Sequence, residues 1–134
     1  MKLTTDPEIS GPFGPYSHAA LIPHNCNVLA ISGLVGCDAN GMVPESPKAQ
    51  ATLIFESLSS LLTRHGLGTK HMAKLNLFVT NRAHLADIRG VRDNWLKDHR
   101  PAMSLILVAG LGNPDWHIEV DGFAAFEPRA EPSA

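Results

Sequence analysis

The sequence predicts a single α+β domain in which two helices lie on one face of a mixed β-sheet. Its length of 134 residues is that of one ordinary domain. Hydrophobic residues make up 44% of the chain and charged residues 18%, a balance typical of globular rather than disordered proteins. Hydrophobic patterns of strand and helix period follow one another in the order β-β-α-β-α-β-β.

The first part of the chain is expected to be an irregular arm followed by two extended segments. The stretch "ISGPFGPYSHAALI" is dense in Gly and Pro, and Tyr16 and His18 lie near its end, where the chain becomes extended. Residues 27–34, "NVLAISGL", are rich in residues that favour strands. Gly33 interrupts this pattern, which suggests a β-bulge or a close backbone approach.

A change of hydrophobic period marks the first helix. Ser46 is placed to cap it, and Pro47 suits its first turn. Apolar residues then recur at helical spacing, at Ala51, Ile54, Leu58, Leu61 and Leu62. Gly66 and Gly68 follow and are expected to end the helix.

The second half of the chain contains a strand, a helix and two further strands. A strand is expected over about 72–80 and a second helix over about 83–97. The stretch 103–111, "MSLILVAGL", is the next predicted strand, and 117–126, "HIEVDGFAAF", is the last. The polar tail over 127–134 is expected to be frayed. Each crossover is long enough to place a helix between parallel strands.

Two helices can cover one face of such a sheet but not both. The other face would expose Leu, Val, Phe and Ala side chains. Leaving them in water costs about 25 cal/mol for each Å² of apolar surface. We therefore expect a homo-oligomer that buries the second face.

Composition and charge argue against several classes of function. The net charge of −2, the pI near 6.4 and the scattered basic residues disfavour a nucleic-acid partner. Neither a signal peptide nor a membrane span is expected. Cys26 and Cys37 lack the spacing of a metal or redox pair and are expected to be free thiols in the cytoplasm. No metal-ligand cluster or phosphate-binding loop is present, so no metal is expected.

Glu119 and Tyr16 are the candidate chemical groups that the pattern itself singles out. Glu119 lies within an otherwise apolar strand, so its carboxylate either points to solvent or lines a cleft and holds water for general acid–base chemistry. Tyr16 is either a packing anchor for the arm or a phenol presented to a ligand. His117 and His18 are either surface histidines or titratable groups of the same cleft; His117 shares the side of the strand that Glu119 faces.

Six short segments occur in a fixed order along the chain: "GPYSHA" at 14–19, "ISGLVG" at 31–36, "NGMVPESPKAQATLIFESLSSLL" at 40–62, "KLNLFVTNRAHL" at 74–85, "RPAMS" at 100–104 and "HIEVDGFA" at 117–124. Singly they are weak signals. In this order and spacing they resemble the RidA/YjgF family, the reactive-intermediate imine deaminases. The resemblance extends from about Gly14 to Ala125.

The resemblance implies a chorismate-mutase-like α+β fold, a single domain with its core at about 14–126. It also implies a homotrimer whose sheets form a central barrel, with ligand clefts between neighbouring subunits. Active members hydrolyse short-lived enamine or imine intermediates such as 2-aminoacrylate to a 2-oxo acid and ammonia, without a cofactor. Tyr16 matches the tyrosine of the family's G-P-Y motif, Gly33 the glycine of its S-G motif, and Glu119 the glutamate that positions water.

The main departure from the family is at its P-A-R-S motif, which here reads P-A-M-S with Met103 in place of the arginine. That arginine holds the substrate carboxylate through two charge-assisted hydrogen bonds, and a thioether makes none. Losing such a contact costs on the order of a hundredfold in binding. The family's S-G-Q reads S-G-L at 32–34, and Arg89 replaces an asparagine common in the second helix. The predicted ligand-binding residues are His18, Ser32, Gly33, Arg89, Ala102, Met103 and Leu105, with Tyr16 and Glu119 in the chemical step.

Three interpretations of the altered motif remain open. In the first, the protein hydrolyses an imine or enamine without the usual carboxylate, and Met103 makes an apolar contact with it. In the second, another cation replaces the lost one; Arg100 faces the other side of an extended segment, so Arg89 or Arg92 of a neighbouring subunit is the better source. In the third, catalysis is lost, and the protein binds or regulates, or serves another reaction in a dedicated metabolic pathway.

Overall fold

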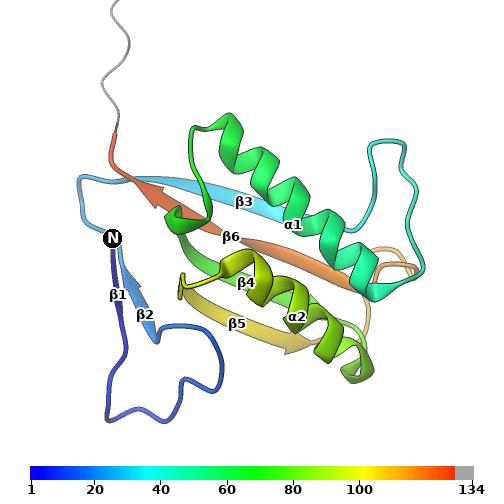
Figure 1. Cartoon of the computed structure of the whole chain (residues 1–134), viewed down its shortest axis with the longest axis horizontal. Helices are drawn as coiled ribbons and strands as arrows, with labels where there is room; N and C mark the ends of the chain where they lie inside the picture. Colours follow the sequence, from blue (N-terminus) through cyan, green and yellow to red (C-terminus); the bar gives the residue numbers. More distant parts are fainter. Residues whose placement is uncertain (129–134) are drawn as a thin grey trace, which may run out of the picture.

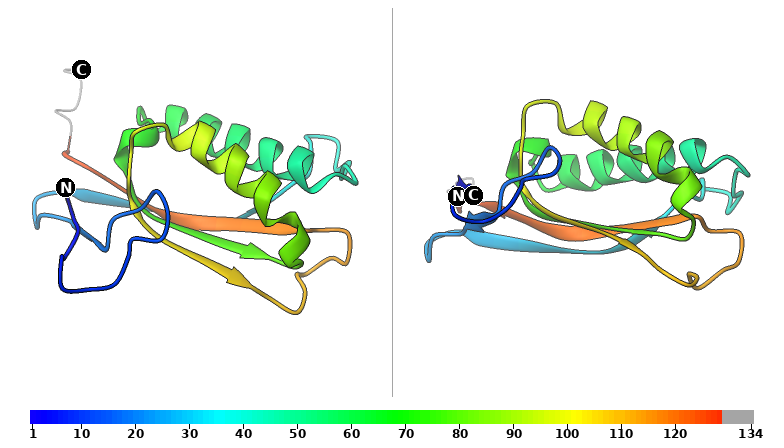
Figure 2. Two further views of the ribbon diagram at one scale, coloured as in Figure 1. Left: turned by 60° about the horizontal axis from the view of Figure 1, so that its bottom comes forward. Right: turned by 90° about the horizontal axis from the view of Figure 1, so that it is seen from below.

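Four strands form one mixed sheet, and both helices pack on the same face of it (Figures 1 and 2). The computed structural model describes residues 1–128, so the predicted polar tail lies outside the described residues from 129 onward. The predicted α+β fold with two helices over a mixed sheet is confirmed. The elements are β1 (Lys2–Thr4), β2 (Ala19–Leu21), β3 (Asn27–Val35), α1 (Pro47–Arg64), β4 (Met72–Val79), α2 (Leu85–Leu96), β5 (Ala102–Leu107) and β6 (Ile118–Phe126).

The strand order in the main sheet is β3-β6-β4-β5. β6 runs antiparallel to both of its neighbours, β3 and β4, whereas β4 and β5 are parallel. β3 and β4 therefore point the same way, and α1 connects them across β6. α2 connects the adjacent strands β4 and β5. Both helical crossovers join parallel strands, as the lengths of the connections predict.

The structure corrects several predicted boundaries. β5 ends at Leu107, short of the expected end at 111. α2 begins at Leu85 rather than at 83, because the Asn81 side chain accepts a hydrogen bond from the N–H of Ala83 and starts a 3-10 turn first. β1 pairs with β2 in a separate antiparallel sheet, and the sequence pattern did not reveal β1.

Local sequence accounts for both ends of α1. The Ser46 hydroxyl accepts a hydrogen bond from the N–H of Ala49 at 3.2 Å, and Pro47 takes the first helical position. Gly66 adopts a φ of 70°, a left-handed conformation that glycine accepts without strain. The predicted cap and stop signals are therefore confirmed.

The core lies between the helices and the sheet. It is formed by the apolar stripe of α1 and by the helix-facing residues of the central strands. Its completely buried members include Ala51, Ile54 and Leu62 of α1, Leu75, Leu77 and Val79 of β4, and Ile118 of β6. The alternation along the strands places every second side chain on the opposite face of the sheet.

One polar side chain, Gln50, is completely buried in α1 and joins three segments of the chain. Its Nε2 donates hydrogen bonds to the carbonyl oxygens of Pro44 and Asp115, each at 2.8 Å. Its Oε1 accepts a hydrogen bond from the N–H of His117 at 2.8 Å. Gly36 allows this close packing, since a Cβ there would lie only 2.8 Å from Cγ of Gln50. Gln50 thus holds the start of α1 against the segment that leads into β6.

The face of the sheet opposite the helices carries exposed apolar side chains. Val28 of β3, Phe123 of β6 and Ile106 of β5 are 50%, 44% and 47% exposed. In the right-hand view of Figure 2 both helices lie above the sheet, and among the described residues no helix lies below it. The uncovered apolar face expected from the sequence is present. Within residues 1–128, no helix combines the length and apolar character that a membrane span requires.

We predict that Gln50→Leu lowers the free energy of unfolding by roughly 2–3 kcal/mol, because it removes three hydrogen bonds from partly buried backbone groups and leaves those groups unpaired. Denaturant unfolding followed by circular dichroism measures the change. Glu56→Gln, on the exposed side of the same helix, is the control and is expected to shift stability by less than about 0.5 kcal/mol. Equal stability of the two variants would contradict the role given to Gln50.

Candidate functional site

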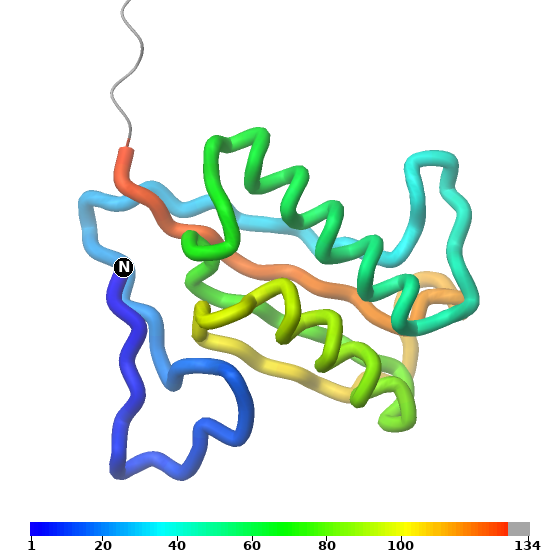
Figure 3. The backbone as a smooth tube through the Cα atoms, in the orientation of Figure 1, coloured from blue at the N-terminus to red at the C-terminus, as the bar shows by residue number. Residues whose placement is uncertain are grey.

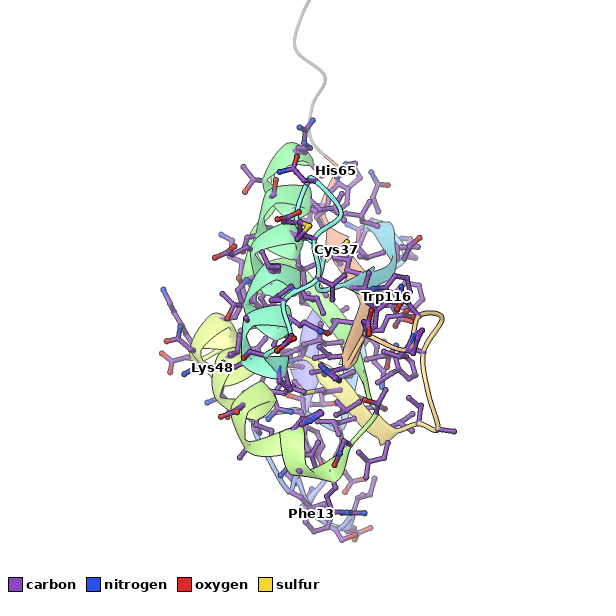
Figure 4. All side chains as sticks on the ribbon, turned by 90° about the vertical axis from the view of Figure 1, so that its right-hand side faces the viewer. Phe13, Cys37, Lys48, His65 and Trp116 are labelled. Carbon is purple, nitrogen blue, oxygen red and sulfur yellow. The ribbon has the colours of Figure 1, made fainter. Side chains whose placement is uncertain are left out.

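A cavity of about 500 Å³ lies between the N-terminal arm, α2 and β5. Figure 3 shows the arm folding back beside the start of β5. Phe13, near the outer turn of the arm, and His65, after α1, lie at opposite ends of the molecule in Figure 4. The cavity is lined by Phe13, Gly14, Pro15, Tyr16, Arg89, Arg92, Asp93, Met103 and Leu105.

The strand register places Met103 and Leu105 in this cavity. They pair with Leu75 and Leu77 of β4, which are completely buried beneath the helices, so they share the helix-facing side of the sheet. β5 is an edge strand, and nothing of the main sheet lies beyond it. Its helix-facing side chains are therefore open to the arm and to α2. Met103, which replaces the arginine of the family motif, therefore lines the cavity.

Hydrogen bonds hold the arm at the start of β5 and position Tyr16. The N–H of Ser17 donates to the carbonyl of Pro101 at 3.0 Å, and the hydroxyl of Ser17 donates to the carbonyl of Arg100. The phenol oxygen of Tyr16 accepts a hydrogen bond from the N–H of Phe13 at 3.0 Å. Tyr16 therefore anchors the arm and lines the cavity at the same time, and its O–H remains a potential donor.

Two arginines reach the cavity from α2. Arg89 and Arg92 are three residues apart, so they lie on the same side of the helix. Arg89 is exposed, but Arg92 is only 5% exposed. Its Nε donates to the carboxylate of Asp93 at 2.9 Å, and among the described residues its two terminal amino groups have no hydrogen-bond partner. Sequence reasoning considered Arg92 only as a residue from a neighbouring subunit, whereas the structure places it beside Met103 of the same chain.

A second cluster lies on the open face of the sheet and contains Glu119, Ser32 and Gly33. Glu119 is half-buried and alternates with Ile118 and Val120, which are buried on the helix side. The pairing of β3 with β6 shifts between Ile31 and Leu34, which is the bulge that Gly33 predicts. A Cβ at Gly33 would lie 2.7 Å from the carboxyl carbon of Glu119. Gly33 thus leaves room for the carboxylate.

The two clusters are on opposite faces of the sheet. One chain brings Tyr16, Arg89, Met103 and Leu105 together, but it does not bring Glu119 to them. Ala102, beside Met103, points to the open face and lines a shallow hollow with Val28 and Phe123. A single copy of the chain therefore presents two half-sites.

The remaining sequence candidates make local contacts. The His18 ring accepts a hydrogen bond from the N–H of Asp6 at 3.0 Å and lies 3.2 Å from the carbonyl oxygen of Ser10, so it holds the arm in shape. Arg100 donates to the carbonyl oxygens of Lys97 and His99, at the end of α2. Neither residue is among those that line the cavity.

His117 packs against His84 with the ring centroids 4.9 Å apart. Burial, followed by the neighbouring His117, lowers the pKa of His84. Within residues 1–128, no hydrogen bond joins His117 to Glu119, and no group of three or more His, Cys, Asp or Glu side chains is placed to hold a metal ion. The ionisable groups of the two half-sites are therefore two carboxylates, a phenol and two guanidinium groups.

Comparison with known proteins finds a family model and a relative that match most of this chain. The family model described as Endoribonuclease L-PSP matches residues 8–126. A 2-iminobutanoate/2-iminopropanoate deaminase of Dermatophagoides farinae is 24% identical over 128 residues, which cover 94% of this chain and 97% of that protein.

Solved structures show the same fold. YyfB of Yersinia pestis, from the conserved Rid protein family, superposes with a TM-score of 0.77 at 24% identity over 93% of this chain and 98% of that one. RidA from an Antarctic Psychrobacter superposes with a TM-score of 0.70 at 24% identity over 94% of this chain and 100% of that one.

We predict that Gly33→Ala displaces the Glu119 carboxylate while the fold is kept. The new Cβ meets the end of a flexible side chain, and Gly33 is not in the left-handed region, so stability should fall by about 1 kcal/mol or less. A crystal structure of the variant and a thermal melt check both parts. Gly68→Ala is the control, because a Cβ there meets nothing within 4 Å. An unmoved Glu119 in the Gly33 variant would refute the prediction.

Proposed function

The chain belongs to the RidA/YjgF family, which the Endoribonuclease L-PSP model describes, and from this premise we propose that it binds or hydrolyses an enamine or imine intermediate other than 2-aminoacrylate. The reaction takes place in a cleft between subunits of a homotrimer. The single observation that carries this proposal is the separation of Glu119 from the cavity that holds Tyr16 and Met103. Two such half-sites make one complete site only when they come from different chains.

The apolar open face of the sheet supports the same assembly. Val28, Ile106 and Phe123 project from three strands of that face and are about half exposed in the single chain. Burying these side chains against other copies of the chain removes the free-energy cost of exposing their apolar surface to water. The same contact brings the Glu119 side of one subunit toward its neighbour.

In the hydrolytic reaction, Glu119 acts as a general base on a water molecule. The water oxygen bonds to the imine carbon while its proton passes to the Glu119 carboxylate. Attack on the protonated imine gives a neutral carbinolamine, and Glu119 then returns its proton to the nitrogen. The carbon–nitrogen bond breaks as the carboxylate of Glu119 takes the proton of the carbinolamine hydroxyl, and the nitrogen leaves as ammonia. The carbon becomes a carbonyl group. Tyr16 orients the ligand through its phenol, and no cofactor takes part in these steps.

Met103 sets this protein apart from members that handle 2-aminoacrylate. Its thioether contributes apolar contact and no charge at the position where the family arginine binds a carboxylate. The substrate therefore differs from that of the arginine-containing members. The alternative is a catalytically silent binding or regulatory protein, or one that serves another reaction in a metabolic pathway, and the same loss of the arginine favours it.

The name of the family model does not lead us to propose RNA cleavage. The chain has a net charge of −2, with 11 Lys and Arg residues against 13 Asp and Glu. Proteins that bind the phosphate backbone concentrate positive charge on one face. A small molecule suits the cavity of about 500 Å³ better than a nucleic acid does.

We predict little or no ammonia release from 2-aminoacrylate generated in situ by a dehydratase. Met103→Arg should create or raise this activity by about tenfold or more, because a guanidinium supplies two charge-assisted hydrogen bonds to the carboxylate. A coupled ammonia assay measures both rates. Met42→Arg, on an exposed loop outside the cavity, is the control and should leave the rate unchanged. A wild-type rate equal to that of an arginine-containing relative would overturn the role given to Met103.

Under the first interpretation of the altered motif, in which the substrate lacks a carboxylate, a hydrolase acting through Glu119 should turn over a carboxylate-free imine. It should lose this activity in Glu119→Gln, by roughly 100-fold or more. Tyr16→Phe should also lower the rate. Mixed trimers refolded from equal amounts of these two variants should regain about a quarter of the sites, since each restored site takes Glu119 from one chain and Tyr16 from another. Absence of any recovery would refute the inter-subunit cleft. Ligand-induced thermal stabilisation without turnover would instead identify the binding protein.

A further inference from the structure

Arg92 is a buried residue whose guanidinium is only partly paired. At 5% exposure it has lost most of its contact with water. Its Nε bond to Asp93, which is itself 48% exposed, uses one of its five N–H donors. Among the described residues, the donors of the two terminal amino groups have no hydrogen-bond partner, although Arg92 lines the cavity. Among the described residues, the unpaired side-chain nitrogens that are cut off from solvent belong to His84 and Trp116. The amino groups of Arg92 therefore still face the open cavity, where an anion can pair with them.

The charges around the cavity define the kind of partner that Arg92 lacks. Arg89 and Arg92 contribute two positive charges and Asp93 contributes one negative charge. In the single chain the lining therefore has one excess positive charge, on the side that α2 forms, and this side suits the anionic end of a ligand. A planar guanidinium with free amino groups matches the two oxygens of a carboxylate in particular.

The rest of the lining is largely apolar. Met103 and Leu105 form the strand side of the cavity, and Pro15 and Phe13 form the arm side. An inorganic phosphate or sulfate would leave these side chains without contact. An organic molecule with an apolar body and one anionic end would use both parts of the cavity.

We infer that Arg92, supported by Arg89, binds the anionic group of a small organic monocarboxylate in this cavity, in place of the arginine that Met103 replaces. This inference rests on the proposed function, since it takes the cavity to be half of the ligand cleft. The anion-binding cation has moved from the edge strand β5 to the neighbouring helix α2. The ligand accordingly keeps its carboxylate but holds it against α2, with its apolar body on Met103 and Leu105.

Binding of benzoate and butanoate, compared with their neutral amides, tests this assignment by titration calorimetry on the full chain. The acids should bind to the wild-type protein, more weakly at high salt, and at least about tenfold more tightly than benzamide and butanamide. Arg92→Gln should remove this preference. Arg64→Gln should leave it intact, because Arg64 adjoins His65 at the opposite end of the molecule from Phe13 (Figure 4). Equal binding of acids and amides, or no binding of either acid, would overturn the inference.

A second variant keeps the test independent of the folding of Arg92→Gln. Asp93→Asn changes a half-exposed side chain and removes the one negative charge of the lining, so benzoate affinity should rise by a few-fold. An unchanged or lower affinity would count against the assignment.

The two proposals fail in different ways. Benzoate binding that depends on Arg92, without turnover of any imine, would support the anion site and contradict the proposed hydrolase activity. Turnover that depends on Glu119 but not on Arg92 would support the hydrolase activity and contradict the anion site.

Discussion

α1 and α2 pack on the same face of the β3-β6-β4-β5 sheet, where Leu75, Leu77 and Ile118 are completely buried. Strand alternation then sends every other side chain to a face that no helix covers. Glu119 is on that open face, and Met103 is on the covered face at the edge. The division of the candidate chemistry into two half-sites is thus a consequence of one-sided packing.

Polar contacts at the end of the sheet hold the helices and strands in this one-sided arrangement. Gln50 replaces water for three backbone groups between α1 and the segment before β6. By holding the N–H of His117, it positions the start of the strand on which Glu119 lies. Gly33 and Gly36 serve this arrangement in the same way, since each leaves space that a larger side chain would fill. The half-site at Glu119 is therefore tied to the core through main-chain geometry rather than through its own carboxylate.

The half-site on the other face depends on two segments far apart in sequence. Ser17 holds the arm at the start of β5 through two hydrogen bonds, so that Tyr16 and Met103 line the same cavity. The second helix then contributes Arg92 to the same cavity. Loss of the family arginine does not leave this cavity without positive charge. A cation remains, at a different position and on a different element.

Periodicity and turn chemistry determined the two helices, the strands of the main sheet and the bulge at Gly33, and the resemblance to the family identified Met103 as the position where its arginine is missing. The helices, strands and bulge are local features, because they follow from side-chain spacing and from backbone conformations that single residues favour. Only the tertiary structure decided that β6 lies between β3 and β4, that the arm docks on β5, and that Arg92 is buried beside Met103 with its terminal amino groups unpaired. Those outcomes depend on hydrogen bonds and packing between distant segments, whose register and burial no local pattern specifies.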